Sequence, residues 1–410
     1  MTQTFARNRF TWLMYLLLAF YGYFINILGP ITPFLMDELK LTYTQSSLHF
    51  TAFAFGIILV GLGGHWVIRR VGRWRALWLG AFGLSLGAGL LLAGRTPVVT
   101  IGAAFLMGLV GSLILSVVPS ALADEHGELR TVAISEANVV SSVVCAAAPL
   151  LVGLFAGRAP ALGGWRLALA VAMLAPVLLR VIVGRVSFPE AGSNGAGRSA
   201  GAAVGQAGNA PAYARAALPA CYWLYWTALV LAISTEFCMI FWSADYLEKT
   251  VAMPKASAAQ AVSLFLGGMI IGRLAGSRLV IRFGATQVIT SSLLVAMVGF
   301  GLYWAAPVAW LGAAGLFVTG LGVASLYPMI ISLAIGASGG NTVQASARSS
   351  LASGTAIFCL PLVLGRLADA VGIRMAYGVV FVLLVGVFVM IQAAGKAALA
   401  VEEGRVSVRG

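Results

Sequence analysis

Residues 219–246 read PACYWLYWTALVLAISTEFCMIFWSADY, and Glu236 is the only charged side chain between Arg215 and Asp245. About 20 consecutive apolar residues are enough to cross a bilayer as a helix, so this stretch predicts a membrane span. The helical rise places Glu236 roughly 16 Å from the Tyr246 end, inside the hydrocarbon region. An ionised carboxylate is costly at that depth unless it is paired, protonated or in contact with water. Glu236 is therefore either a structural group that binds a neighbouring helix or snorkels, or a protonatable group in a transport pathway.

The rest of the chain has the same apolar character. Hydrophobic residues make up 60% of the 410 residues and charged residues only 10%, and the mean hydropathy is +0.96. A soluble domain cannot hide that much apolar surface, so the composition predicts an all-α integral membrane protein. The net charge of +13 does not indicate nucleic acid as a partner, because the basic residues lie in short loops between apolar runs. The four cysteines fall in apolar runs without metal-ligand spacing, and we expect neither a metal site nor a cofactor.

Charges, glycines and prolines divide the apolar runs into twelve predicted transmembrane helices. They cover about 10–35, 46–68, 74–94, 98–122, 131–157, 165–184, 218–246, 257–283, 286–306, 308–336, 343–371 and 374–398. Of the 26 Lys and Arg residues, 17 fall on the side that holds both termini, 8 on the other side and Arg273 within a span. This bias predicts a multi-pass protein of the plasma (inner) membrane with both termini in the cytoplasm.

The longest connection between spans is rich in Gly, Ala and Ser and has no periodicity, which predicts a flexible cytoplasmic linker over 185–217. It separates an N-terminal six-helix bundle (1–184) from a C-terminal six-helix bundle with a cytoplasmic tail (218–410). Short motifs recur between the halves at an offset of 212 residues: Pro149-Leu150-x-x-Gly153-x-x-Ala156 returns as Pro361-Leu362-x-x-Gly365-x-x-Ala368, and Gly108-Leu109 as Gly320-Leu321. The repeat predicts two pseudo-symmetric bundles with a transport site near the membrane midplane.

These features resemble the major facilitator superfamily over nearly the whole chain. The signature loop of that family follows the second span and reads G-x-x-x-D-R-x-G-R-R. Here Arg70-Val71-Gly72-Arg73 fits its end, while Arg69 stands at the acidic position and His65 at the leading Gly. In the family the acid helps to latch the cytoplasmic face, so we expect a substitute in which an arginine of this loop pairs with an acid of the next cytoplasmic loop. The residues of this predicted cytoplasmic gate are Arg69, Arg70, Arg73, Asp124, Glu125 and Glu128.

A narrower resemblance covers the C-terminal half. Three segments are similar to the fucose-permease-like sugar branch: Glu236 with Trp242 and Tyr246, Ser263-Leu264-Phe265-x-Gly267-x-x-x-x-Gly272-Arg273, and Leu326-Tyr327-Pro328. Many proton-driven drug exporters carry an Arg in the fourth span, where this chain has Ala104. Their G-P-x-x-G-G motif in the fifth span keeps only Pro149 and Gly153. The resemblance therefore favours a sugar-type symporter over a drug antiporter.

Two embedded charges and several polar or aromatic side chains form the predicted transport site. Arg273 lies roughly 24 Å from the outer end of its span and Glu236 roughly 16 Å from the end of its own, so an extended Arg covers much of the difference. We assign proton coupling to Glu236 and Arg273, with snorkelling of Arg273 to the cytoplasmic face as an equal alternative. Side chains spaced along single helix faces supply the predicted substrate contacts, although the same stripes suit helix packing. They are Tyr23, Asn26, Ser112, Ser116, Asn138, Ser142, Trp242, Tyr327 and Thr355.

No catalytic motif competes with transport. The sequence has no HExxH, Walker or Rossmann pattern, so an enzyme is not expected. We predict secondary active transport of a small polar organic solute, with sugars as candidates, by proton-coupled alternating access. The expected molecule is a monomer in membrane lipid. Two alternatives stay open, a proton-coupled exporter of drugs or lipophilic metabolites and a non-transporting membrane sensor.

Overall fold

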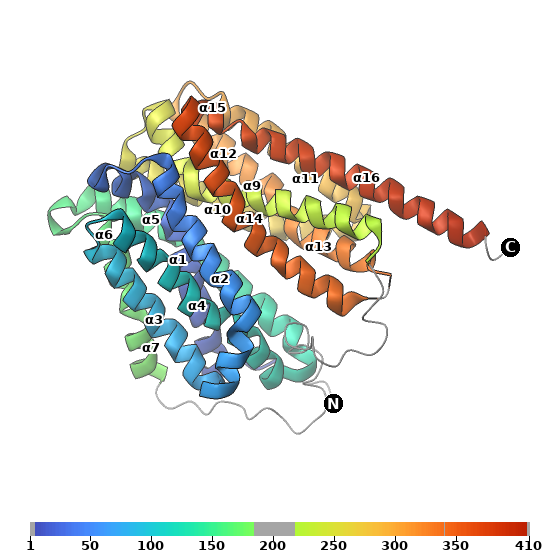
Figure 1. The fold of residues 1–410 in the computed structure, drawn as a ribbon, viewed down its shortest axis with the longest axis horizontal. Helices are drawn as coiled ribbons and strands as arrows, with labels where there is room; N and C mark the ends of the chain where they lie inside the picture. The colour runs from blue at the N-terminus through green and yellow to red at the C-terminus, as the bar shows by residue number, and fades with distance from the viewer. Residues whose placement is uncertain (1–4, 184–217, 340, 408–410) are drawn as a thin grey trace. The chain divides into compact units, whose positions relative to one another are not determined.

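The computed structural model describes residues 5–183, 218–339 and 341–407, which form helices joined by short turns (Figure 1). The described residues contain no β-strand, as the all-α membrane prediction requires. They contain 11 helical runs long and apolar enough to span a membrane, and one of these runs, Pro97–Arg158, holds two long helices. The linker predicted over 185–217 lies outside the described residues.

The first two helices before the linker begin at side-chain caps. Asn8 precedes the first helix and its side-chain oxygen accepts a hydrogen bond from the Thr11 backbone N–H at 2.8 Å. Thr42 and Gln45 form a reciprocal capping box before the second helix, which satisfies backbone N–H groups that a helix leaves unpaired. The helices are α1 (Arg9–Leu39), α2 (Tyr43–Val71), α3 (Arg73–Ala93), α4 (Pro97–His126), η1 (Gly127–Leu129), α5 (Arg130–Arg158), η2 (Pro160–Leu162), α6 (Arg166–Met173) and α7 (Ala175–Val183).

Two predicted spans after the linker are divided: 374–398, and 308–336, which we call the broken span. The span predicted over 308–336 forms two helices because Pro328 lacks the N–H that would bond to the Ala324 carbonyl. Before the linker, the span predicted over 165–184 is also divided into two helices, and Pro176 lies in the first turn of α7. The helices after the linker are α9 (Ala220–Val251), α10 (Lys255–Phe283), α11 (Ala285–Trp304), α12 (Ala309–Val323), α13 (Leu326–Gly336), α14 (Thr342–Val371), α15 (Ile373–Ala376) and α16 (Val379–Ser407).

The chain divides into two compact units. The first unit comprises the described residues within Met1–Gly205 together with Phe241–Asp245 and Pro254–Ser263, and the second comprises the remainder. This division differs from the predicted bundle boundaries, since short segments of α9 and α10 group with the first unit. There the Phe241 ring stacks on Phe50 with centroids 4.0 Å apart. The division into six and six helices stays a prediction.

Glycines fix the same helix–helix contact in each unit. In the first unit a Cβ on Gly108 of α4 would stand 2.0 Å from the Phe53 carbonyl oxygen of α2. In the second unit a Cβ on Gly320 of α12 would stand 2.1 Å from the Phe265 carbonyl oxygen of α10. Only glycine permits so close an approach. Both residues of the second contact lie 212 positions after those of the first, so the repeat seen in the sequence is also a repeat of packing.

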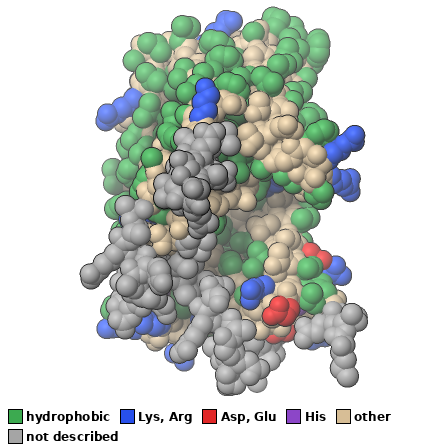
Figure 2. Space-filling view, turned by 90° about the vertical axis from the view of Figure 1, so that its right-hand side faces the viewer, with side chains coloured by type: hydrophobic (Ala, Val, Ile, Leu, Met, Phe, Trp, Pro, Cys, Tyr) green, Lys and Arg blue, Asp and Glu red, His purple; other side chains and the backbone are tan. Residues whose placement is uncertain are grey.

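Large apolar side chains cover much of the molecular surface. In Figure 2 hydrophobic side chains are spread over much of the visible face. Ile281 is 87% exposed and Val181 is 74% exposed. Such exposure is expected of helices that face lipid and would be unfavourable in water. The structure is therefore that of a multi-pass membrane protein.

Candidate functional site

The two embedded charges meet within the second unit. The Arg273 Nη2 of α10 lies 3.6 Å from the Glu236 Oε1 of α9, and the two side chains are 41% and 17% exposed respectively. An opposite charge at this distance stabilises each ion in a region where neither is stable alone. The extended Arg273 side chain therefore spans the difference in membrane depth between the two residues that the sequence predicts.

Close packing of α10 against the broken span places Arg273. A Cβ on Gly272 would lie 2.4 Å from the Leu321 carbonyl oxygen, and one on Gly276 would lie 2.1 Å from Ser325 Oγ. The Ser325 hydroxyl, at the break between α12 and α13, donates to the Gly272 carbonyl at 3.3 Å. These contacts hold the start of α13 against α10 one residue away from Arg273.

Tyr327 completes this cluster from the first turn of α13. It is half-buried, its hydroxyl contacts Ser353 of α14, and it lies within electrostatic range of both Glu236 and Arg273. A carboxylate, a guanidinium and a phenol therefore gather from α9, α10 and α13. The cluster combines a group that can gain or lose a proton with groups that can bind polar solutes through hydrogen bonds.

Thr355 lies two residues beyond Ser353 on α14. Its hydroxyl donates to the Leu351 carbonyl at 2.9 Å, and its side chain is half-buried. A hydroxyl bonded to the preceding turn still has accepting capacity for a second partner.

Three predicted contacts of the first unit are buried in its helix packing. The Tyr23 hydroxyl of α1 donates to the Ala168 carbonyl of α6 at 2.9 Å. The Ser112 hydroxyl donates to the Gly108 carbonyl at 2.5 Å. Asn26 donates to the Gly22 carbonyl at 2.8 Å, while its Oδ1 is buried without a hydrogen-bond partner among the described residues. The Tyr23 and Ser112 hydroxyls are thus hydrogen-bonded within the helix packing of this structure.

The polar stripes of α4 and α5 leave three other side chains more accessible. Ser116 and Asn138 are exposed and Ser142 is half-buried. Each is hydrogen-bonded to the carbonyl four residues earlier, at 3.2 Å for Ser116 and 2.8 Å for the other two. This is the usual bond of a hydroxyl or amide on a membrane helix.

Trp242 is fully buried in the first unit. Its ring centroid lies 5.7 Å from those of Phe50 and Tyr43. Its indole N–H has no hydrogen-bond partner among the described residues. In this structure Trp242 therefore belongs to an aromatic core cluster and is covered.

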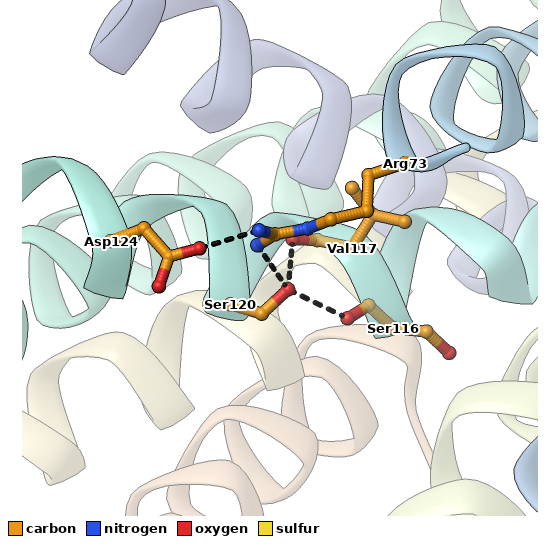
Figure 3. Close-up of polar contacts among 5 residues, drawn as sticks. All are labelled: Arg73, Ser116, Val117, Ser120 and Asp124. Carbon is orange, nitrogen blue, oxygen red and sulfur yellow. Dashed lines mark hydrogen bonds and ion pairs between the residues drawn. The ribbon is translucent and has the colours of Figure 1, made fainter. Parts of the chain in front are cut away.

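One ion pair of the predicted gate is present at the start of α3. The Arg73 Nη1 lies 2.5 Å from the Asp124 Oδ2 of α4, and its Nη2 donates to Ser120 Oγ at 3.0 Å. Figure 3 shows the guanidinium lying between the two α4 side chains. Both charged side chains are largely buried, so this pair is shielded more than a surface salt bridge. At the offset of 212 the second unit has Ala285 and Gly336, so the pair is not repeated.

The remaining gate residues have other environments. The Arg70 guanidinium lies over the Trp66 ring at 3.9 Å. Glu125 accepts a hydrogen bond from Asn8 Nδ2 at 2.5 Å. Arg69 and Glu128 are exposed. Of the predicted combinations, the pair shown in Figure 3 is the one that the described residues form.

The segment before α1 adds contacts that were not predicted from the sequence. Arg7 binds Glu136 of α5 through two hydrogen bonds, of 2.7 Å from Nε and 2.6 Å from Nη2. The Tyr15 hydroxyl donates to the same carboxylate at 3.2 Å. The hydrogen bond to Glu136 raises the pKa of Arg7 above its ordinary value, so the guanidinium stays charged. In the sequence, the position of Glu136 near the end of its predicted span was the one sign that its carboxylate would need a basic partner.

The fold defines a class of polytopic α-helical membrane proteins. A family model described as Major Facilitator Superfamily matches residues 14–249, more than half of the chain. The chain belongs to the Major Facilitator Superfamily.

Solved structures with this fold cover nearly the whole chain. A bacterial homolog of the human lysosomal transporter Spinster, in an inward-facing occupied conformation, aligns with a TM-score of 0.74 at 13% identity over 96% of this chain and 98% of that one. The nucleoside transporter NupG gives 0.72 at 12% identity over 95% and 98%. The fucose:proton symporter FucP of E. coli gives 0.57 at 15% identity over 93% and 98%. At these identities the likeness shows the fold, and that fold is one of membrane transporters.

Proposed function

We propose that this protein is a proton-coupled secondary transporter of a small polar organic solute, with sugars as the leading class and symport as the direction of coupling. The observation that supports the proposal is the Glu236–Arg273 contact of 3.6 Å, in a span that contains no other charge from Pro219 to Ala244. Such an embedded carboxylate is by default a functional group in a membrane protein.

In the proposed cycle Glu236 exchanges its proton as the protein alternates between states open to either side of the membrane. The ionised carboxylate is stabilised by Arg273, and the protonated one needs no cation. A substrate that draws Arg273 or Tyr327 toward itself changes the balance between the two forms, because an ion pair and a substrate hydrogen bond compete for the same donors. Binding and proton exchange are thereby linked through one cluster.

The other predicted assignments enter the proposal in different roles. Tyr327 and Thr355 are the proposed substrate contacts of the second unit, and Ser116, Asn138 and Ser142 those of the first. Arg73 and Asp124 are proposed to hold one conformational state at the cytoplasmic end. The proposed molecule is a monomer in the plasma (inner) membrane with both termini in the cytoplasm.

Reconstitution tests this proposal after a substrate has been identified. A thermal-shift screen of sugars, organic acids and lipophilic cations comes first, because a ligand that binds only the folded state raises its melting temperature. In proteoliposomes with a pH difference of about 2 units, a 1:1 symporter accumulates substrate up to about 100-fold. We expect Glu236→Gln to abolish this accumulation and to preserve substrate counterflow.

The matched control is Glu248→Gln, which makes the same change near the end of the same helix. Accumulation by this control should equal that of the original protein. If Glu236→Gln accumulates substrate normally, the carboxylate is structural and the coupling proposal is wrong. A protein that shows no counterflow for any solute that stabilises it would instead be a sensor on a transporter scaffold.

A further inference from the structure

A cluster of basic and aromatic side chains lies where α3 begins and α7 ends, within the first unit. The Arg180 guanidinium of α7 lies over the Trp78 ring of α3 with Cζ 5.6 Å from its centroid. The rings of Trp74 and Trp78 meet edge to face at 5.7 Å. Arg75 lies three residues before Trp78, on the same side of the helix. Both Arg75 and Arg180 are exposed. We call these four residues the basic–aromatic patch.

The Trp78 ring supports the basic side chain of the patch. The Trp78 side chain is only 8% exposed, and the Arg180 guanidinium is held over its ring by a cation–π contact. An anionic acceptor is the natural complement of a guanidinium held in this way.

An exposed apolar surface continues from the patch along both helices. On α3 it comprises Leu79, Phe82 and Leu86, and on α7 Leu178 and Ile182, with exposures from 43% for Phe82 to 75% for Ile182. The other side of α3 packs on α4 through glycines, since a Cβ on Gly83 would lie 2.4 Å from Val110. The helix therefore turns one face toward its own unit and leaves this apolar strip free for lipid chains.

We propose that the basic–aromatic patch binds an anionic phospholipid. Arg75 and Arg180 bind the phosphodiester, the Trp78 ring holds the Arg180 guanidinium in place, and the acyl chains lie along the apolar strip of α3 and α7. Arginine beside tryptophan at a helix end is the arrangement expected at the level of lipid headgroups. A free phosphate would match the cations but would leave the adjoining apolar strip without a partner, so the strip identifies a lipid as the occupant.

Lipid titration of the purified full-length protein tests this site. Native mass spectrometry in detergent measures the apparent Kd of the first bound dioleoyl phosphatidylglycerol, with dioleoyl phosphatidylcholine as the zwitterionic comparison. We expect phosphatidylglycerol to bind more tightly than phosphatidylcholine. Arg75→Gln and Arg180→Gln should each weaken phosphatidylglycerol binding about fivefold, the effect expected of one basic residue near the headgroups. Trp78→Leu removes the aromatic ring under Arg180 and should also weaken binding.

The matched control is Arg282→Gln in the second unit. Arg282 is exposed at the end of α10 and lies over the Phe283 ring at 5.3 Å, so it offers a cation and an aromatic ring without the patch. Its loss should leave the Kd unchanged. The proposal fails if the control weakens binding as much as the patch variants, if the two lipids bind equally, or if inorganic phosphate at millimolar concentration displaces the lipid completely.

Discussion

Glu236→Gln and Arg273→Gln should each lower the free energy of unfolding. The double variant should lose less than the sum of the two single losses. At 3.6 Å, two unit charges attract by about 4–5 kcal/mol when the effective dielectric constant is about 20. Arg273 is 41% exposed, so solvent screening reduces the net contribution of the pair to about 1–2 kcal/mol. Each single change leaves an embedded charge without its partner, whereas the double change removes both charges.

The assay is a double-mutant cycle on the free energy of unfolding in mixed detergent micelles. Glu236→Gln, Arg273→Gln and the double variant are compared with the original protein, and we expect a coupling energy of about 1–2 kcal/mol. Costs that add within about 0.5 kcal/mol would show that the two side chains do not stabilise each other. That result would refute the reasoning on which the proposed coupling cluster rests.

Three further predictions concern two ion pairs of the first unit and the glycine packing of the second unit. Reversing the pair, with Arg73→Asp and Asp124→Arg combined, should restore part of the transport rate that either single change lowers. Gly320→Ala should lower the melting temperature strongly because its Cβ would stand 2.1 Å from a carbonyl oxygen, while Gly301→Ala, which meets nothing within 4 Å, should leave it nearly unchanged. Arg7→Gln should make the segment before α1 more sensitive to limited proteolysis, and an unchanged cleavage rate would mean that the contact with Glu136 does not hold it.

The sequence was sufficient to predict the membrane fold, and it identified the two deepest charges without determining that they pair. Hydropathy alone indicates where the spans run, but an embedded arginine can be stabilised either by a carboxylate or by snorkelling to the membrane surface, and sequence depth does not distinguish the two. The residues that contact across long separations were harder to predict. Arg7 and Glu136 are 129 positions apart, and nothing in the pattern around either residue names the other. Whether a polar stripe faces the core or an opening is equally hidden, as the buried Ser112 and exposed Ser116 show.

Prolines and glycines explain much of what the hydropathy pattern missed. Pro328 divides a span that appears continuous by composition, and this break brings Ser325 and Tyr327 toward α10. The missing N–H of Pro328 makes the break itself predictable. Which residues the break brings together depends on Gly272, where α10 packs against α12, and the sequence does not show that contact. Local signals thus locate a break in a helix, and packing determines what that break positions.

The backbone crossings at Gly108 and Gly320 suggest how this architecture tolerates change. When a few glycine contacts set the distance and angle between two helices, most neighbouring residues do not determine that packing. Mutations can then accumulate on the remaining surfaces while the framework persists, which is consistent with a TM-score of 0.74 at only 13% identity. For protein engineers, the crossings mark the positions to leave unchanged, and the proposed substrate site around Tyr327 is the first place to test for a change of cargo.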